Sequence, residues 1–193
     1  MKRKKNIKSR IFTNYQAPEL LTILQQGGIG VLPTDTIYGL VTSALNPEAV
    51  GRLYRLKARD TAKPSIILIG DIKQLDLFGI SEADKRKAGR YWPGPISLVL
   101  ACHDKAFSYL HHGTNSLAFR LPDNQQLWEL LERSGPLVAP SANPQSKKPA
   151  QTIAEAQHYF GDKVDFYVDG GKLSGKPSKL ISLLNKTPKI LRD

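Results

Sequence analysis

Three basic side chains close together in the sequence could bind an anion. They are Lys57, Arg59 and Lys63, in the stretch RLKARDTAKPSIILIG that covers residues 55–70. Residues two apart point to nearly opposite sides of a helix, whereas they share a face on extended chain. Lys57 and Arg59 can therefore converge on one ligand only if the preceding helix ends near Lys57. A helix that continued through Lys63 would instead present them as a solvated surface.

Two polar loops that follow apolar runs could complete such a site. The first, PTDTIYGL at 33–40, offers hydroxyls and a carboxylate, and we expect Gly39 to permit a tight backbone there. The second, APSANPQSKKPAQT at 139–152, carries Ser141 and Asn143, which can face one ligand from non-helical chain. Ligands of α/β sheets commonly sit beyond the carboxyl ends of strands. These segments predict an anion pocket, although each loop alone also fits an ordinary turn or helix cap.

Other catalytic patterns are weak in this sequence. Gly170, Gly175 and Lys176 have the spacing of a phosphate-binding P-loop, but Pro177 stands where that loop needs Ser or Thr. We interpret this segment as a connection between strands. The four histidines lack the spacing of zinc ligands, so no metal site is predicted. Cys102 ends an apolar run and is expected to be a buried packing residue.

Alternating apolar and helical patterns indicate the elements that would position these groups. Strands are expected at 29–33, 65–70, 95–102, 116–121, 136–140 and 164–169, followed by two strands around a turn at 185–187. Helices are expected at 18–28, 46–57, 81–92, 124–135 and 152–160. Asn46 and Thr152 are candidate N-caps, and Thr152 forms a capping box with Glu155. This alternation predicts an α/β (α+β) fold with a mixed sheet.

Composition and charge narrow the class of protein. The chain has 193 residues, 40% of them hydrophobic and 23% charged, as in an ordinary globular domain. No apolar run approaches the roughly 20 residues of a transmembrane helix. One cysteine gives no sign of export, so we expect a cytoplasmic protein without membrane association. We expect a single domain at 15–193 behind a flexible basic arm at 1–14. The net charge of +11 fits either a solubilising arm or contact with a polyanion such as RNA.

Five motifs together resemble the YrdC/TsaC family of threonylcarbamoyl-AMP synthases. They are PTDTIYGL, Lys-x-Arg at 57–59 with KP at 63–64, YWPGPISLVL, LAFRLPD and PLVAPSANPQSKKPAQT, in the family's order and spacing. The likeness runs from about residue 15 to the end and matches the short single-domain form. It implies a YrdC-like twisted mixed sheet with flanking helices around a large basic concave cavity. Some relatives carry a His after KP that faces threonine, and PSIILIG has none.

The resemblance also implies a reaction. L-threonine and bicarbonate or CO₂ form N-carboxy-threonine, whose carboxylate attacks the α-phosphate of ATP. Pyrophosphate leaves and threonylcarbamoyl-AMP forms, with ATP as a substrate and Mg²⁺ expected on its phosphates. Partner proteins then transfer the threonylcarbamoyl group to tRNA. A non-catalytic protein that binds double-stranded RNA through the basic cavity, or a paralogue of the same fold with another substrate, stays an alternative.

The family pattern assigns roles to residues of this sequence. It implies that the catalytic residues are Lys57, Arg59, Ser141 and Asn143. The ATP site would comprise these four residues together with Lys63, Ser116, Thr152 and Arg192. The threonine site would comprise Thr36, Arg120 and Ser178, with the Arg120 guanidinium suited to hold the threonine carboxylate in a two-pronged contact.

Overall fold

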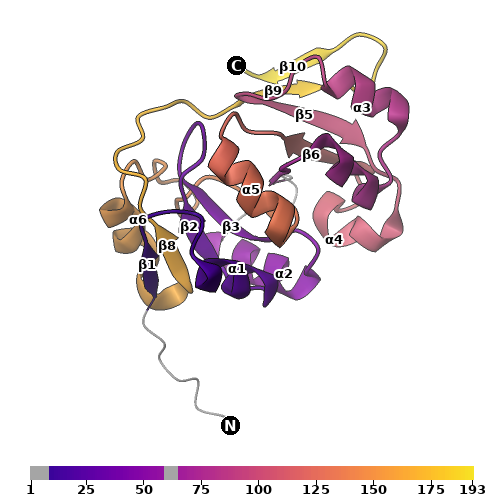
Figure 1. Cartoon of the computed structure of the whole chain (residues 1–193). Coiled ribbons are helices and arrows are strands. Elements are labelled where there is room, and N and C mark those ends of the chain that lie inside the picture. Colours follow the sequence, from indigo (N-terminus) through magenta and orange to yellow (C-terminus); the bar gives the residue numbers. More distant parts are fainter. Residues whose placement is uncertain (1–8, 59–64) are drawn as a thin grey trace.

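The computed structural model describes residues 9–58 and 65–193 (Figure 1). The strands in these ranges are β1 (Arg10–Phe12), β2 (Gly30–Leu32), β3 (Gly39–Ser43), β4 (Ile66–Leu68), β5 (Ile96–Ala101), β6 (Ser116–Arg120), β7 (Leu137–Val138), β8 (Phe166–Val168), β9 (Lys179–Ser182) and β10 (Lys189–Arg192). The α-helices are α1 (Pro18–Gln25), α2 (Pro47–Lys57), α3 (Glu82–Ala88), α4 (Ser108–His111), α5 (Gln125–Ser134) and α6 (Ile153–Phe160). Three 3₁₀ segments join them, at Ile72–Phe78, Lys105–Phe107 and Gly161–Lys163.

The strands form one mixed sheet in the order β1-β8-β2-β3-β7-β4-β6-β5-β9-β10. The pairs β1/β8, β8/β2, β4/β6 and β5/β9 are parallel, and the remaining neighbours are antiparallel. The predicted mixed sheet is therefore confirmed. β1 and β10 are its two edges, and Figure 1 shows them at the lower left and at the top of the molecule.

Helix α2 begins and ends where its sequence predicts. The Asn46 side chain accepts a hydrogen bond from the Ala49 amide at 3.0 Å, and Pro47 occupies the first turn. The helix ends at Lys57 because Ala58 adopts a left-handed conformation, with φ of 50°. The observed end of α2 at Lys57 confirms the helix boundary that convergence of Lys57 and Arg59 on one ligand requires. Arg59 and Lys63 themselves lie outside the described residues.

Apolar side chains cover both faces of the sheet, as the alternation along the strands requires. Helices α1 and α5 pack on one face, against a buried cluster that includes Leu32 of β2 and Leu68 of β4. Their neighbours Val31 and Ile67 point to the other face and join the larger cluster, which includes Leu53 of α2. Elements on both faces thus hold the middle of the sheet in place.

Among the strands, β1 and β3 differ from the sequence expectation. Strand β1 lies inside the arm predicted at 1–14, so the ordered sheet begins at Arg10 and not after residue 14. Its backbone pairs in parallel with β8, and the Ser9 hydroxyl donates to the Val164 carbonyl at 2.6 Å. Strand β3 was not predicted, because it follows the polar loop at 33–38 directly. In the described parts of the chain, no helix is both long and apolar enough to span a bilayer.

Candidate functional site

A cavity of about 840 Å³ opens over the middle of the sheet. Part of its lining is an apolar row across three adjacent strands, in which Ala118 of β6 pairs with Ile66 of β4 and with Val99 of β5. Polar side chains line it as well, and they include Thr34, Thr36, Thr114, Ser116, Arg120, Ser141, Ser178, Ser182 and Arg192. Ligand pockets generally measure roughly 300–1,000 Å³, so this cavity can hold a small metabolite or nucleotide.

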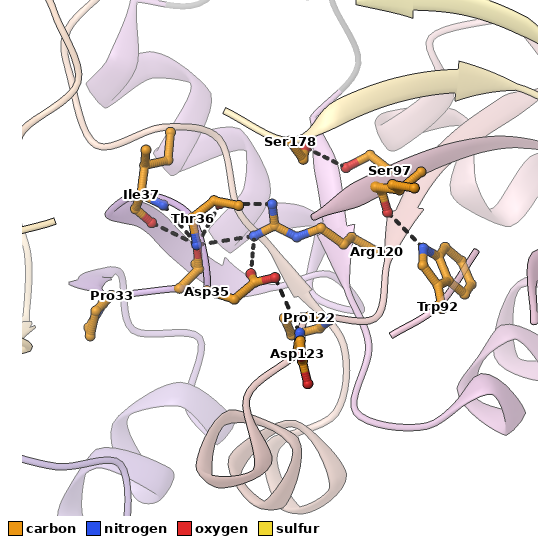
Figure 2. A network of polar contacts seen from close by, with 12 residues as sticks. Pro33, Asp35, Thr36, Ile37, Trp92, Ser97, Arg120, Pro122, Asp123 and Ser178 are labelled. Atoms are coloured by element: carbon orange, nitrogen blue, oxygen red, sulfur yellow. Dashed lines mark hydrogen bonds and ion pairs between the residues drawn. The ribbon is translucent and has the colours of Figure 1, made fainter. Parts of the chain in front are cut away.

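Arg120, at the end of β6, is held by the loop that follows β2 (Figure 2). Its Nη1 donates to the Thr36 hydroxyl at 2.9 Å, and its Nη2 donates to the Thr34 hydroxyl at 3.0 Å. Nη2 also lies 3.0 Å from Asp35 Oδ1, an ion pair that lacks the alignment of a hydrogen bond. The second Asp35 oxygen accepts the Asp123 amide. Burial lowers the pKa of Arg120, and the Asp35 carboxylate opposes this effect.

The loop at 33–38 is organised by a threonine and needs no glycine. The Thr34 hydroxyl donates to the Ile37 carbonyl at 2.7 Å and faces the Thr36 hydroxyl at 3.0 Å. Gly39 opens β3 without a positive φ, and an added Cβ would find its nearest neighbour, the Ala139 Cβ, at 3.6 Å. The expected tight backbone at Gly39 is therefore wrong, because side-chain hydrogen bonds make the turn.

A second guanidinium enters the cavity from the last strand. Arg192 Nε and Nη2 donate to the Ser178 carbonyl at 3.0 and 2.8 Å, and Nη2 lies 3.3 Å from the Ser178 hydroxyl. A β-bulge in β10 makes this possible, because Arg192 rather than Leu191 pairs with Leu180. Both Leu191 and Arg192 consequently line the cavity, although consecutive residues of a regular strand face opposite sides.

The two arginines differ in charge compensation. Asp35 neutralises Arg120 at the buried end of the cavity, where the side chains are 7% and 5% exposed. No carboxylate of the described residues pairs with Arg192, and its Nη1 makes no hydrogen bond to them. Arg192 thus gives this wall a net positive charge, which favours an anionic ligand.

Lys57 lies behind the cavity wall. It is 3% exposed, and its ammonium donates to the Ser141 carbonyl at 2.5 Å, the Asn143 carbonyl at 2.8 Å and Asn143 Oδ1 at 3.0 Å. The Lys57 carbonyl accepts the Gln145 amide at 3.1 Å. The end of α2 thus holds the loop that carries Ser141, and a direct contact between Lys57 and a phosphate stays a prediction.

The structure brings most of the predicted site residues to one place. Six line the cavity: Thr36, Ser116, Arg120, Ser141, Ser178 and Arg192. Lys57 and Asn143 support Ser141 from behind, with Asn143 Oδ1 accepting the Ser141 hydroxyl at 2.6 Å. Thr152 does not line the cavity; its hydroxyl caps α6 by accepting the Glu155 amide at 3.2 Å.

Two residues of this site went unrecognised in the sequence. Ser97 is fully buried in β5, and its hydroxyl lies 2.8 Å from that of Ser178 (Figure 2). Tyr38 is also fully buried; its hydroxyl donates to the Gly171 carbonyl at 2.8 Å and accepts the Gly170 amide at 2.9 Å. Burial raises the pKa of Tyr38. A serine inside the apolar run ISLVLA was the one available signal, because buried polar groups need partners.

The fold and the site define an α/β protein with a cation-lined cavity over a twisted mixed sheet. The family model Sua5_yciO_yrdC, described as "Telomere recombination", matches residues 22–193. The chain belongs to this Sua5/YciO/YrdC family.

Several curated relatives carry the same name. The chain is 37% identical over 183 residues to a threonylcarbamoyl-AMP synthase of Bacillus subtilis, covering 92% of this chain and 53% of the relative. It is 31% identical over 186 residues to a threonylcarbamoyl-AMP synthase of Pseudomonas paraeruginosa, covering 95% of each. The chain spans about half the length of the Bacillus subtilis and Pyrococcus abyssi relatives it matches.

Solved structures agree with the family. The Pyrococcus abyssi Sua5 structure complexed with L-threonine superimposes with a TM-score of 0.87 at 30% identity, covering 95% of this chain and 57% of that one. The Escherichia coli YciO structure gives a TM-score of 0.82 at 24% identity, covering 96% and 95%, and supports the fold alone.

Proposed function

We propose that this chain is an L-threonylcarbamoyladenylate synthase. It would join L-threonine, bicarbonate or CO₂ and ATP into threonylcarbamoyl-AMP and pyrophosphate, for the threonylcarbamoyladenosine modification of tRNA in the cytoplasm. The observation that carries the proposal is the convergence of six predicted site residues on one cavity. The shared name of the curated relatives supports the same reaction.

We assign the amino-acid end of the site to the buried side of the cavity. Thr36, Arg120 and Ser178 offer two hydroxyls and a guanidinium around one volume. Asp35 and the threonine hydroxyls fix the Arg120 guanidinium before any ligand arrives, so little rotamer freedom remains to be lost on binding. This end suits a compact zwitterion with a carboxylate.

We assign the nucleotide end to Arg192, Ser116 and Ser141, with Arg59 and Lys63 contributing from the segment after α2. The reaction joins two anions, so the site must offset their repulsion and stabilise charge on the α-phosphate oxygens. Arg192 supplies an unpaired positive charge for that purpose. Mg²⁺ carried by the triphosphate would add to it. The bonds balance because the carbamate oxygen forms a new bond to the α-phosphorus as the bond to pyrophosphate breaks, and one water molecule leaves when bicarbonate supplies the carbon.

Pyrophosphate release tests the proposal directly. The protein is supplied with ATP, Mg²⁺, L-threonine and bicarbonate, and each component is omitted in turn. We expect release that requires both threonine and bicarbonate, and adenylate formation that matches it in amount. Release that continues without threonine or without bicarbonate would contradict the assignment.

A pair of variants tests whether this cavity is the site. Arg192→Gln should lower kcat/KM for ATP by roughly tenfold to a hundredfold, because a charged hydrogen bond contributes about 1.5–3 kcal/mol. Lys186→Gln, which removes the same charge from the exposed turn of the same hairpin, should change it less than twofold. Equal effects would assign the loss to net charge alone and not to the cavity.

We further propose that the partners are tRNA and the proteins that receive the adenylate. The basic residues at the N-terminus would favour RNA contact through long-range electrostatics. Deleting residues 1–8, which leaves β1 intact, should weaken RNA association and leave adenylate formation unchanged. A deletion that stops adenylate formation in the absence of RNA would contradict this role.

A further inference from the structure

We infer that Ser97 is a positioning residue that makes the Ser178 hydroxyl a hydrogen-bond donor toward the substrate and steadies Arg192. This inference rests on the proposed function for its substrate, an amino acid that presents an oxygen acceptor. It concerns a residue that does not line the cavity and that the sequence motifs do not single out as functional.

The direction of the Ser97–Ser178 hydrogen bond follows from the number of available partners. Ser97 is fully buried, and its hydroxyl has one neighbour, the Ser178 Oγ at 2.8 Å, among the residues that the structure describes. If Ser178 donated this bond, the Ser97 hydrogen would have no acceptor, which costs about 1–3 kcal/mol in a buried site. Ser97 therefore donates and Ser178 accepts.

The second lone pair of Ser178 is also occupied. Arg192 Nη2 lies 3.3 Å from the same oxygen and can only donate to it. A hydroxyl oxygen accepts two hydrogen bonds, so both of its acceptor positions are filled from the protein. The Ser178 hydrogen is left over, and Ser178 lines the cavity. The group offered to a ligand is thus an O–H, which selects a carboxylate or carbonyl oxygen and rejects an ammonium.

The same serine also anchors the second guanidinium. The Ser178 carbonyl accepts from both Nε and Nη2 of Arg192. β10, which carries Arg192, is an edge strand whose four residues are all exposed, so it has little other packing to fix it. Fixing Ser178 from behind through Ser97 therefore orients a hydroxyl and a guanidinium that we place at the two ends of one substrate site.

Substitutions at Ser97 test this role by their effect on substrate affinity. Ser97→Ala and Ser97→Cys, the second nearly equal in volume but a weak donor, should raise the KM for L-threonine roughly tenfold with kcat changed less than twofold. Ser97→Thr, which keeps the hydroxyl, should stay within about threefold of the original protein. The double variant Ser97→Ala/Ser178→Ala should be no worse than Ser178→Ala. The inference would be overturned if the effects of the two single substitutions multiplied in the double variant. It would also be overturned if Ser97→Cys left the KM for L-threonine unchanged.

A second readout needs no substrate. In the ligand-free protein, the Arg192 Nε–H should give an NMR signal protected from hydrogen exchange by the Ser178 carbonyl. Ser97→Ala should speed its exchange at least fivefold, and Ser182→Ala, which removes another hydroxyl from the same hairpin, should not. If the original protein makes no threonine-dependent pyrophosphate, the proposed function fails while this measurement still decides the role of Ser97. If the Arg192 Nε–H exchanged at the same rate in Ser97→Ala as in the original protein, the proposed role of Ser97 would be overturned.

Discussion

Replacing Lys57 distinguishes two ways in which a buried lysine can serve this site. Lys57→Met keeps the length of the side chain and removes the ammonium that holds the loop at 141–143. Lys57→Arg keeps the positive charge but substitutes a planar guanidinium for a compact ammonium. If Lys57 acts through the loop, both substitutions should damage the site. If it binds phosphate directly, the arginine should retain much of the nucleotide affinity.

The expected loss can be worked out from the acceptors that lose the ammonium. The Ser141 carbonyl keeps the Asn143 amide at 2.9 Å, and Asn143 Oδ1 keeps the Ser141 hydroxyl at 2.6 Å. Within the described residues, the Asn143 carbonyl is the acceptor left without a donor. One unpaired buried acceptor costs about 1–3 kcal/mol. About 2 kcal/mol corresponds to roughly a thirtyfold loss in kcat/KM and a Tm lower by about 4–8 °C.

Pyrophosphate release and thermal unfolding of the ligand-free protein together check this expectation. Both Lys57 variants should lose activity and Tm, whereas Lys186→Met, at an exposed turn, should lose neither. Lys57→Arg with the original KM for ATP, together with an unchanged Tm in Lys57→Met, would refute the role through the loop.

Three further predictions concern residues around the cavity. Asp35→Asn should lower the free energy of unfolding by about 3 kcal/mol, because it leaves the buried Arg120 guanidinium without a counter-charge. An unchanged Tm would show that the Asp35–Arg120 pair contributes little to stability. Gly175→Ala should destabilise the connection between β8 and β9, since the new Cβ would clash with the Thr36 carbonyl oxygen. Gly51→Ala on α2 should instead raise Tm slightly, because its new Cβ would make only an ordinary contact with Arg55 Nη1 at 3.5 Å. A matching loss of Tm at both sites would contradict the steric reason. Burial raises the pKa of Tyr109 from 10.0 to about 12, so the neutral phenol stabilises the fold below pH 10, and this contribution should disappear between pH 10 and 12. Tyr109→Phe should flatten the decline of stability over that interval, and an equally steep decline would assign it to other groups.

The sequence was sufficient for most elements because their signals are local. Asn46 before Pro47, and the apolar alternation in the strands, define ends and faces without reference to the rest of the chain. The end of α2 at Lys57 was required by the site hypothesis, yet Ala58 carries no ordinary sign of a left-handed cap, a position that usually favours glycine. Functional reasoning located that boundary where propensity could not.

The features that the sequence left open depend on distant partners. The pairing of β1 with β8 joins residues more than 150 positions apart, as does the contact of Ser9 with Val164. The Asp35–Arg120 ion pair and the Ser97–Ser178 hydrogen bond likewise require the register of several strands. A sequence motif can identify such residues as functional. Which carboxylate neutralises which arginine, and which hydroxyl orients another, depends on the register of the folded sheet.

The bulged edge strand also has a practical bearing on how this protein is prepared. Arg192 lines the cavity, and Asp193 follows it at once, paired with Lys179 at 2.7 Å. Any affinity tag, fluorescent fusion or surface linker attached directly after Asp193 would start one residue from the cavity wall. The opposite edge of the sheet, at β1, is separated from that wall by several strands. A tether placed directly after Asp193 is therefore expected to distort titrations and kinetics more than a tether placed at the β1 edge.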